Sequence, residues 1–112
     1  MVSQPAPVAI VTGASRGAGR SIAIALGGHG CTVYVTGRSE RSDDASLPGT
    51  IHETAAAVSA AGGQGIAVRV DHADDAQVEA LFRQVESEQG RLDILVNNGC
   101  AIHDELTTPG RF

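Results

Sequence analysis

The alternation of short apolar segments with helical segments is the feature that most constrains the fold of this 112-residue chain. The apolar segments are rich in β-branched residues, which suits strands buried on both faces of a parallel sheet. Strands separated by helices pair in parallel through right-handed crossovers. We therefore expect an α/β fold, a partial Rossmann-type doubly wound parallel sheet with strand order 3-2-1-4. The expected strands cover residues 8–11, 31–37, 65–70 and 92–97, and the expected helices cover 16–28, 50–61 and 74–88.

The apolar positions of the first and third helical segments predict which side of each helix faces the sheet. Glycines at positions 27, 28 and 30 are expected to end the first helix. Asp74 is expected to cap the third helix, whose first turn is acidic. The predicted inward side chains are Ile22, Ala25 and Leu26 in the first helix, and Val78, Leu81, Phe82 and Val85 in the third.

Composition restricts the class of protein. A net charge of −5 and a pI near 5.2 argue against binding to nucleic acid or to a membrane surface. No apolar run approaches the ~18 residues of a membrane span, and the first residues lack the pattern of a signal peptide. The two cysteines, Cys31 and Cys100, and the four histidines show no metal-ligand spacing. We therefore expect a cytoplasmic protein with reduced thiols and no bound metal.

Three glycines follow the first strand in the segment "TGASRGAG", residues 12–19. Gly13 lets the chain turn sharply off the strand. Gly17 and Gly19 lack a Cβ, so a phosphate-bearing ligand can approach the backbone and the helix can pack close to the sheet. The free N–H groups and positive dipole end of the helix would then meet a pyrophosphate. The alternative is an ordinary turn between a strand and a helix.

Three motifs in register resemble those of the short-chain dehydrogenase/reductase family. "TGASRGAG" resembles the family's TGxxxGxG motif, and "LVNNG", residues 95–99, resembles its NNAG motif. "RVDHAD", which contains Asp71, resembles the segment with the family's adenine-contacting acid. The segment "PGTIHETAAAV", from Pro48, is similar to members with a long loop after the second strand. The resemblance implies that residues 1–112 form the amino-terminal half of a reductase, its NAD(P)-binding Rossmann domain.

The resemblance also implies a nicotinamide dinucleotide cofactor, and the residues after the second strand bear on which one. NAD-preferring relatives carry an acid there, which holds the ribose 2′-hydroxyl and repels a 2′-phosphate. This chain has Gly37 followed by Arg38, and a guanidinium can bind a phosphate with two hydrogen bonds. Arg16, in the glycine-rich segment, adds a second positive charge. NADP(H) is therefore favoured over NAD(H), unless both arginines are merely solvated.

The resemblance carries further residues into the expected site. Asp71 would accept a hydrogen bond from the adenine amino group, although capping of the following helix is an alternative role. Asn98 would lie near the adenine ribose, and Asn97 would tie neighbouring strands together. The chain departs from NNAG in reading Asn-Asn-Gly-Cys, and Cys100 places a side chain where the family has glycine. The expected cofactor-binding residues are Gly13, Ser15, Arg16, Gly17, Ala18, Gly19, Arg38, Asp71, Asn98 and Gly99.

Family reductases move a proton with a Ser and with a Tyr and Lys spaced as YxxxK. This chain has one tyrosine, Tyr34, inside the second predicted strand, followed four residues later by Arg38, and it contains no lysine. We therefore expect no catalytic residue here. One reading is the cofactor half of a homo-oligomeric oxidoreductase that acts on a small carbonyl or alcohol substrate. The other is a non-catalytic dinucleotide-binding module or an inactive gene fragment.

Overall fold

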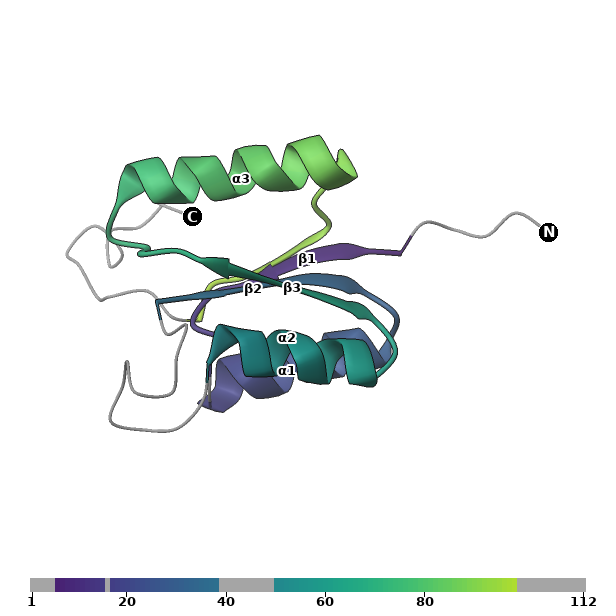
Figure 1. The fold of residues 1–112 in the computed structure, drawn as a ribbon. Coiled ribbons are helices and arrows are strands. Elements are labelled where there is room, and N and C mark those ends of the chain that lie inside the picture. Colours follow the sequence, from purple (N-terminus) through teal and green to yellow (C-terminus); the bar gives the residue numbers. More distant parts are fainter. Residues whose placement is uncertain (1–5, 16, 39–49, 99–112) are drawn as a thin grey trace, which may run out of the picture.

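A four-stranded parallel sheet with strand order β3-β2-β1-β4 forms the centre of the computed structural model, which describes residues 6–15, 17–38 and 50–98. This order and the intervening helices confirm the predicted α/β, Rossmann-like class (Figure 1). The fourth strand is shorter than predicted. In chain order the elements are β1 (Val8–Val11), α1 (Gly17–Gly28), β2 (Thr32–Gly37), α2 (Ile51–Ala60), β3 (Gln64–Arg69), α3 (Asp75–Gln89) and β4 (Ile94–Val96).

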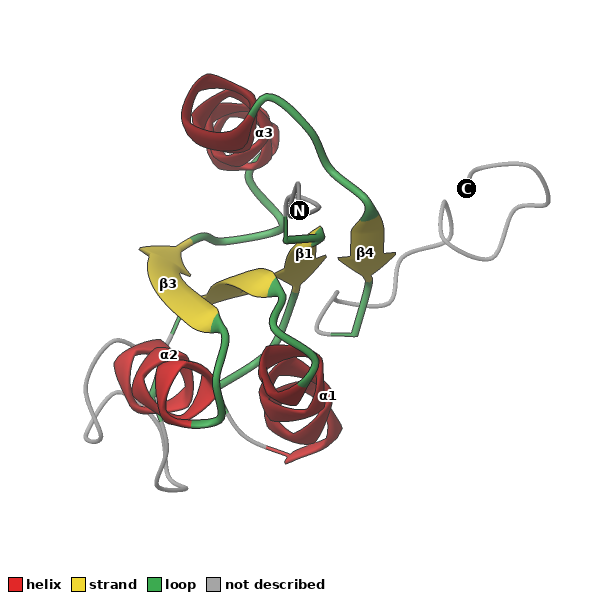
Figure 2. Ribbon diagram, turned by 90° about the vertical axis from the view of Figure 1, so that its right-hand side faces the viewer, coloured by secondary structure: helices red, strands yellow, loops and turns green. Residues whose placement is uncertain are grey.

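Helices cover both faces of the sheet. Figures 1 and 2 show α1 and α2 side by side on one face and α3 on the other. All four residues of β1 and all six of β2 are buried, which explains why their sequences are continuous apolar or β-branched runs. Along β2 the side chains alternate between the two faces. Val33 and Val35 belong to the core under α1 and α2, whereas Tyr34 belongs to the core under α3.

The buried face of α1 differs from the predicted one. Ala25, which was expected to face inward, is exposed, and Ile22 and Leu26 are only partly buried. The prediction was wrong because it placed the larger apolar side chains inward. In the structure, α1 packs against its neighbours through the face that carries its smallest residues. The buried positions, spaced by four residues, are Gly19, Ala23 and Gly27.

Gly27 is a packing residue inside α1, which corrects the prediction that it helps to end the helix. A Cβ at Gly27 would lie 2.7 Å from the carbonyl oxygen of Val58 on α2, so only glycine allows this contact. Gly28 is the last residue of α1, and a Cβ there would meet nothing within 4 Å. Gly30 adopts a left-handed backbone with φ of 84° and makes the turn into β2.

The N-terminus of α3 is capped as predicted, but its inward face is narrower. The Asp74 carboxylate accepts hydrogen bonds from the backbone N–H groups of Ala76 and Gln77. Phe82 is 40% exposed, contrary to the prediction. It lies about 100° around the helix from Leu81 and falls outside the row that rests on the sheet. That row consists of the partly buried Val78 and the buried Leu81 and Val85.

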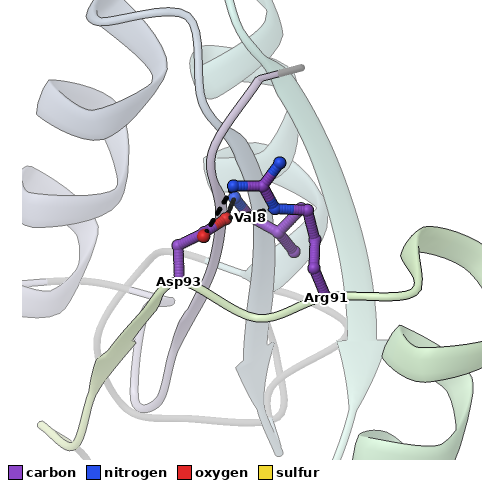
Figure 3. Close-up of polar contacts among 3 residues, drawn as sticks. All are labelled: Val8, Arg91 and Asp93. Carbon is purple, nitrogen blue, oxygen red and sulfur yellow. Dashed lines mark hydrogen bonds and ion pairs between the residues drawn. The ribbon is translucent and has the colours of Figure 1, made fainter. Parts of the chain in front are cut away.

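The amino ends of β1 and β4 are joined by a three-residue cluster (Figure 3). The Val8 N–H donates to Asp93 Oδ2 over 2.8 Å, and the Asp93 N–H donates to the Val8 carbonyl over 2.9 Å. Arg91 donates from Nε and Nη2 to the same carboxylate, and these bonds are the main cause of a lowered pKa for Asp93. The cluster sets the register in which Ala9 pairs with Ile94.

Two adjacent glycines give a matched test of the α1–α2 contact. Gly27→Ala should destabilise the chain by about 1–3 kcal/mol, the usual cost of overpacking, because its Cβ would collide with the Val58 carbonyl. Gly28→Ala should leave stability unchanged or raise it by up to ~1 kcal/mol, because it only adds helix propensity. Chemical denaturation of both variants measures the difference. Equal free energies of unfolding would contradict the close approach of the two helices.

Candidate functional site

The glycine-rich segment and the end of β4 form one hydrogen-bonded unit at the carboxyl edge of the sheet. The Thr12 hydroxyl accepts from the Asn98 N–H over 2.8 Å, and its own proton can go to the Val96 carbonyl or to Asn97 Oδ1, at 3.3 and 3.5 Å. The Thr12 N–H donates to the same Val96 carbonyl. Thr12 is only 3% exposed, whereas Asn97 and Asn98 are exposed, so these bonds are partly buried. The expected tie between neighbouring strands at Asn97 is thus present.

Gly19 makes this unit compact. A Cβ at Gly19 would lie 2.4 Å from the Gly13 carbonyl oxygen and 2.6 Å from Asn98 Nδ2. That amide group in turn donates to the Gly13 carbonyl over 3.3 Å. The start of α1 therefore touches both the turn after β1 and the end of β4, and only a residue without a side chain fits. The predicted contact of Asn98 with a ribose stays a prediction. In the structure, the Gly13 carbonyl accepts one N–H of the Asn98 side-chain amide.

The other side of the glycine-rich segment is open. Gly13 and Gly17 adopt left-handed backbones, with φ of 61° and 64°, which accounts for glycine at both positions. A Cβ at Gly17 would meet nothing within 4 Å, and Ala18 is exposed, whereas Ser15 is buried. The first turn of α1 is thus accessible from outside.

The three described helix N-termini differ in charge. The first turn of α1 contains no acidic residue, whereas α2 carries Glu53 and α3 carries Asp75 there. Thr50 and Asp74 also accept hydrogen bonds from the first turns of α2 and α3. Among the described residues, the first turn of α1 is thus the one without a carboxylate, and its positive dipole end could meet an external anion in the way that helix N-termini meet pyrophosphates. A dinucleotide phosphate fits this exposed, left-handed glycine turn.

The ends of β2 and β3 lie on the same edge of the sheet. The Ala14 N–H donates to the Thr36 carbonyl over 3.1 Å, so the glycine-rich segment is held against the end of β2. Arg38 is the residue directly after β2, and it is exposed. Its predicted partner Arg16 lies outside the described residues. Arg38 is thus available at this edge to an anionic ligand.

Asp71 takes part in the turn that leads into α3. Its Oδ1 accepts from the Ala73 N–H over 3.0 Å, and its own N–H donates to Gln77 Oε1 over 2.8 Å. Helix capping falls to Asp74, as the sequence predicts, so Asp71 shapes the preceding turn instead. The role of Asp71 toward an adenine stays a prediction. Gly99 and Cys100, the other predicted positions at this edge, lie outside the described residues.

His72 is a member of this edge that the sequence analysis left unassigned. Its Nε2 lies 2.9 Å from the Thr36 hydroxyl, which also lies 3.4 Å from the Val11 carbonyl. Partial burial lowers the pKa of His72 below its ordinary value of 6.5, and the nearby Asp71 carboxylate opposes this effect. The folded protein therefore favours the neutral imidazole.

Tyr34 has a structural position. Its ring is fully buried in β2, and its hydroxyl donates to Glu88 over 2.6 Å and accepts from Gln89 Nε2 over 3.2 Å. Burial, followed by the bond to Glu88, raises the pKa of Tyr34 above 10. The side chain thus anchors the end of α3 to the sheet.

Within residues 6–15, 17–38 and 50–98, no group of three His, Cys, Asp or Glu side chains could hold a metal ion. Over the same part of the chain, no helix is both long and apolar enough to span a bilayer. Cys31 is a buried free thiol.

Comparison with known proteins identifies the class. The chain belongs to the short chain dehydrogenase family, whose sequence model matches residues 7–109. Among curated proteins, it is 45% identical over 95 residues to "Dehydrogenase/reductase SDR family member 1" of Mus musculus, which covers 84% of this chain and 28% of that protein. The chain thus spans about a quarter to a third of the length of the curated relatives it matches.

Solved structures agree with this assignment. A short chain dehydrogenase from Mycobacterium thermoresistibile superposes with a TM-score of 0.79 at 33% identity, over 87% of this chain and 34% of that one. A metagenomic short-chain oxidoreductase, solved in complex with NADP, superposes with a TM-score of 0.72 at 34% identity, over 85% of this chain and 39% of that one. Proteins of this family bind nicotinamide dinucleotides and act on small molecules.

The Thr12 hydroxyl gives a test of the joint between the glycine-rich segment and β4. Thr12→Val keeps the side-chain shape but leaves the Asn98 N–H without its acceptor, at an expected cost of about 1–3 kcal/mol in unfolding free energy. Hydrogen exchange of the Asn98 amide should also become faster. Thr12→Ser retains the hydroxyl and should resemble the unmodified chain. Unchanged exchange in Thr12→Val would show that the joint is held by other contacts.

The lowered pKa of His72 makes stability depend on pH in a defined direction. Below pH 6.5 the unfolded chain binds a proton at His72 more readily than the folded chain does. His72 therefore contributes full stability above pH 6.5, and this contribution is lost as pH falls toward the lower pKa of the folded state. As pH falls from about 8 to about 5, the free energy of unfolding should decrease less steeply in His72→Gln than in the unmodified chain. Parallel curves for the two proteins would contradict the assignment.

Proposed function

We propose that this chain is the NADP(H)-binding part of an oxidoreductase of the short-chain dehydrogenase/reductase type. The observation that carries the proposal is the open glycine turn at an α1 N-terminus free of acidic residues, on the same sheet edge as Arg38. A 2′-phosphate needs a cation at the end of β2, where an acid would repel it. The solved relative in complex with NADP supports this choice.

Within this proposal each part of the edge has a task. The first turn of α1 and Gly17 bind the pyrophosphate, Arg38 binds the 2′-phosphate, and Asp71 and Asn98 contact the adenosine. When bound, the nicotinamide exchanges a hydride with a carbonyl or alcohol substrate. The buried hydroxyl of Tyr34 is engaged by Glu88 and Gln89, so we do not assign the proton of that reaction to Tyr34.

The remaining features of the proposal concern the whole protein. We place it in the cytoplasm because cysteine is rare in the chain and Cys31 is a free thiol. The chain spans 28% of the mouse relative, and we propose that it is part of a longer reductase. The catalytic part, the carbonyl or alcohol substrate and a homo-oligomeric assembly are proposals for that longer protein. A non-catalytic dinucleotide-binding module is the second candidate, favoured by the lack of lysine and by the buried position of the one tyrosine.

Arg38 tests the cofactor preference. Arg38→Ala should weaken NADPH binding about tenfold to a hundredfold, the usual effect of a hydrogen bond to a charged group, and leave NADH binding nearly unchanged. Isothermal titration of the chain with each dinucleotide measures both effects. Arg83→Ala is the matched control, since it removes the same charge from the exposed face of α3, where Arg83 pairs with Glu79.

Two results would count against the proposal. Equal losses for NADPH and NADH in Arg38→Ala would contradict the assignment of Arg38 to the 2′-phosphate. A chain that binds neither dinucleotide would contradict the proposed function as a whole, including the second candidate.

A further inference from the structure

One buried hydroxyl connects three segments behind the candidate site. Thr54 lies on the first turns of α2 and is fully buried. Its Oγ1 accepts from Arg20 Nη1 of α1 over 3.3 Å and donates to the backbone carbonyl of Ser15 over 3.5 Å. These partners are 34 and 39 residues away in the sequence. Thr54 is therefore a contact point between α2, the first turn of α1 and the glycine-rich segment.

The chemistry of this position favours a specific role over simple packing. Valine has the same shape as threonine and would fill the position without a polar atom to bury. Burying a hydroxyl costs free energy unless the hydroxyl is hydrogen-bonded, so we infer that threonine is present at this position for its two hydrogen bonds. Thr54 turns the Ser15 carbonyl toward α2 and the protein interior. A carbonyl oxygen turned outward at this segment would repel an approaching phosphate.

The second partner of Thr54 is a cation. Arg20 lies in the first turn of α1 and is half-buried, and the Thr54 hydroxyl fixes one arm of its guanidinium beside the Ser15 backbone. Charge held in a partly buried position is less screened than charge in water. Arg20 therefore adds positive potential at the side of the glycine-rich segment that faces α2.

Two further bonds hold the glycine-rich segment against β2 and α2. The Ala14 N–H binds the Thr36 carbonyl at the end of β2, two residues before Arg38, and the Ser15 carbonyl binds Thr54. When the pyrophosphate is bound at the first turn of α1, a 2′-phosphate reaches Arg38 only if the glycine-rich segment and Arg38 keep a fixed separation. A cofactor without the 2′-phosphate places no such demand on the pair.

We propose that Thr54 is a positioning residue for the phosphorylated dinucleotide, acting through its hydrogen bonds to Ser15 and Arg20. The inference rests on the proposed function and adds a determinant of cofactor discrimination that does not touch the cofactor. Thr54 keeps the glycine-rich segment and the Arg20 charge in the arrangement that a 2′-phosphate needs. The binding of NADH, which has no 2′-phosphate, depends less on the position of the segment and on the Arg20 charge.

Thr54→Val and Thr54→Ser test the proposal as a matched pair. In titrations of the chain, Thr54→Val should bind NADPH about threefold to tenfold more weakly, because it removes the hydroxyl that binds Ser15 and Arg20, and NADH binding should change less. Thr54→Ser retains the hydroxyl and should restore the unmodified ratio of NADH to NADPH dissociation constants. An unchanged ratio in Thr54→Val, while Arg38→Ala lowers it, would overturn the role of Thr54 and leave the proposed function intact.

Hydrogen exchange without cofactor provides a second readout. Thr54→Val should speed amide exchange at Gly17, Ala18 and Gly19, while amides of α3 keep their protection. Arg20→Met removes the other partner from the half-buried surface of α1 and should shift the ratio of dissociation constants in the same direction, even if Thr54→Val fails to fold. Unchanged exchange at the three amides in Thr54→Val would overturn the proposal. If the unmodified chain binds neither dinucleotide, the proposed function fails, and the discrimination proposed for Thr54 fails with it.

Discussion

The absence of a side chain at Gly19 is the constraint on which the arrangement of this edge depends. With a Cβ, the first turn of α1 would collide with the Gly13 carbonyl and with Asn98. The helix would then have to move away from the corner where β1 and β4 end, and the bonds from Asn98 to Thr12 and Gly13 would be strained. The close approach of α1 to this corner and the hydrogen bonds of the sheet edge thus both require glycine at position 19.

The same principle shapes the whole layer formed by α1 and α2. A Cβ at Gly27 would meet the Val58 carbonyl, and one at Gly65 of β3 would lie 2.1 Å from the Ala55 carbonyl. The layer is therefore held by close backbone contacts, which leave little room for adjustment. The opposite face relies on large side chains instead, with the ring of Tyr34 under α3 and its hydroxyl bound to Glu88.

This difference explains which features could be predicted from the sequence. The parallel sheet follows from the alternation of elements and from the handedness of crossovers, and its strand order was predicted by analogy with Rossmann-type sheets. The cap at Asp74 follows from local chemistry. The buried face of α1 could not be found by counting apolar side chains, because its deepest positions, Gly19 and Gly27, have none. Phe82 was predicted to face inward because periodicity alone does not show how many positions around α3 contact the sheet.

The candidate site divides in the same way. Gly13, Gly17 and Gly19 could be predicted because each performs a backbone task that only glycine performs well. The bonds of Thr12 to Asn98 and of Thr54 to Ser15 join residues 86 and 39 positions apart. No local pattern encodes such pairs, and a threonine in a strand or a helix has many ordinary reasons to be there. The motif around Thr12 was the one available signal for the first pair.

The charge of the chain bears on how an acidic protein can bind a ligand that is itself anionic. A net charge of −5 opposes the approach of a dinucleotide at long range, but salt screens that repulsion beyond about 8 Å. Binding is then decided by the charges within that distance. In the described part of the chain, acidic side chains occupy the first turns of α2 and α3 and are absent from that of α1, where Arg20 lies instead. The distribution of charge among the helix ends, more than the net charge of the chain, therefore supports the proposed binding of phosphates at this edge.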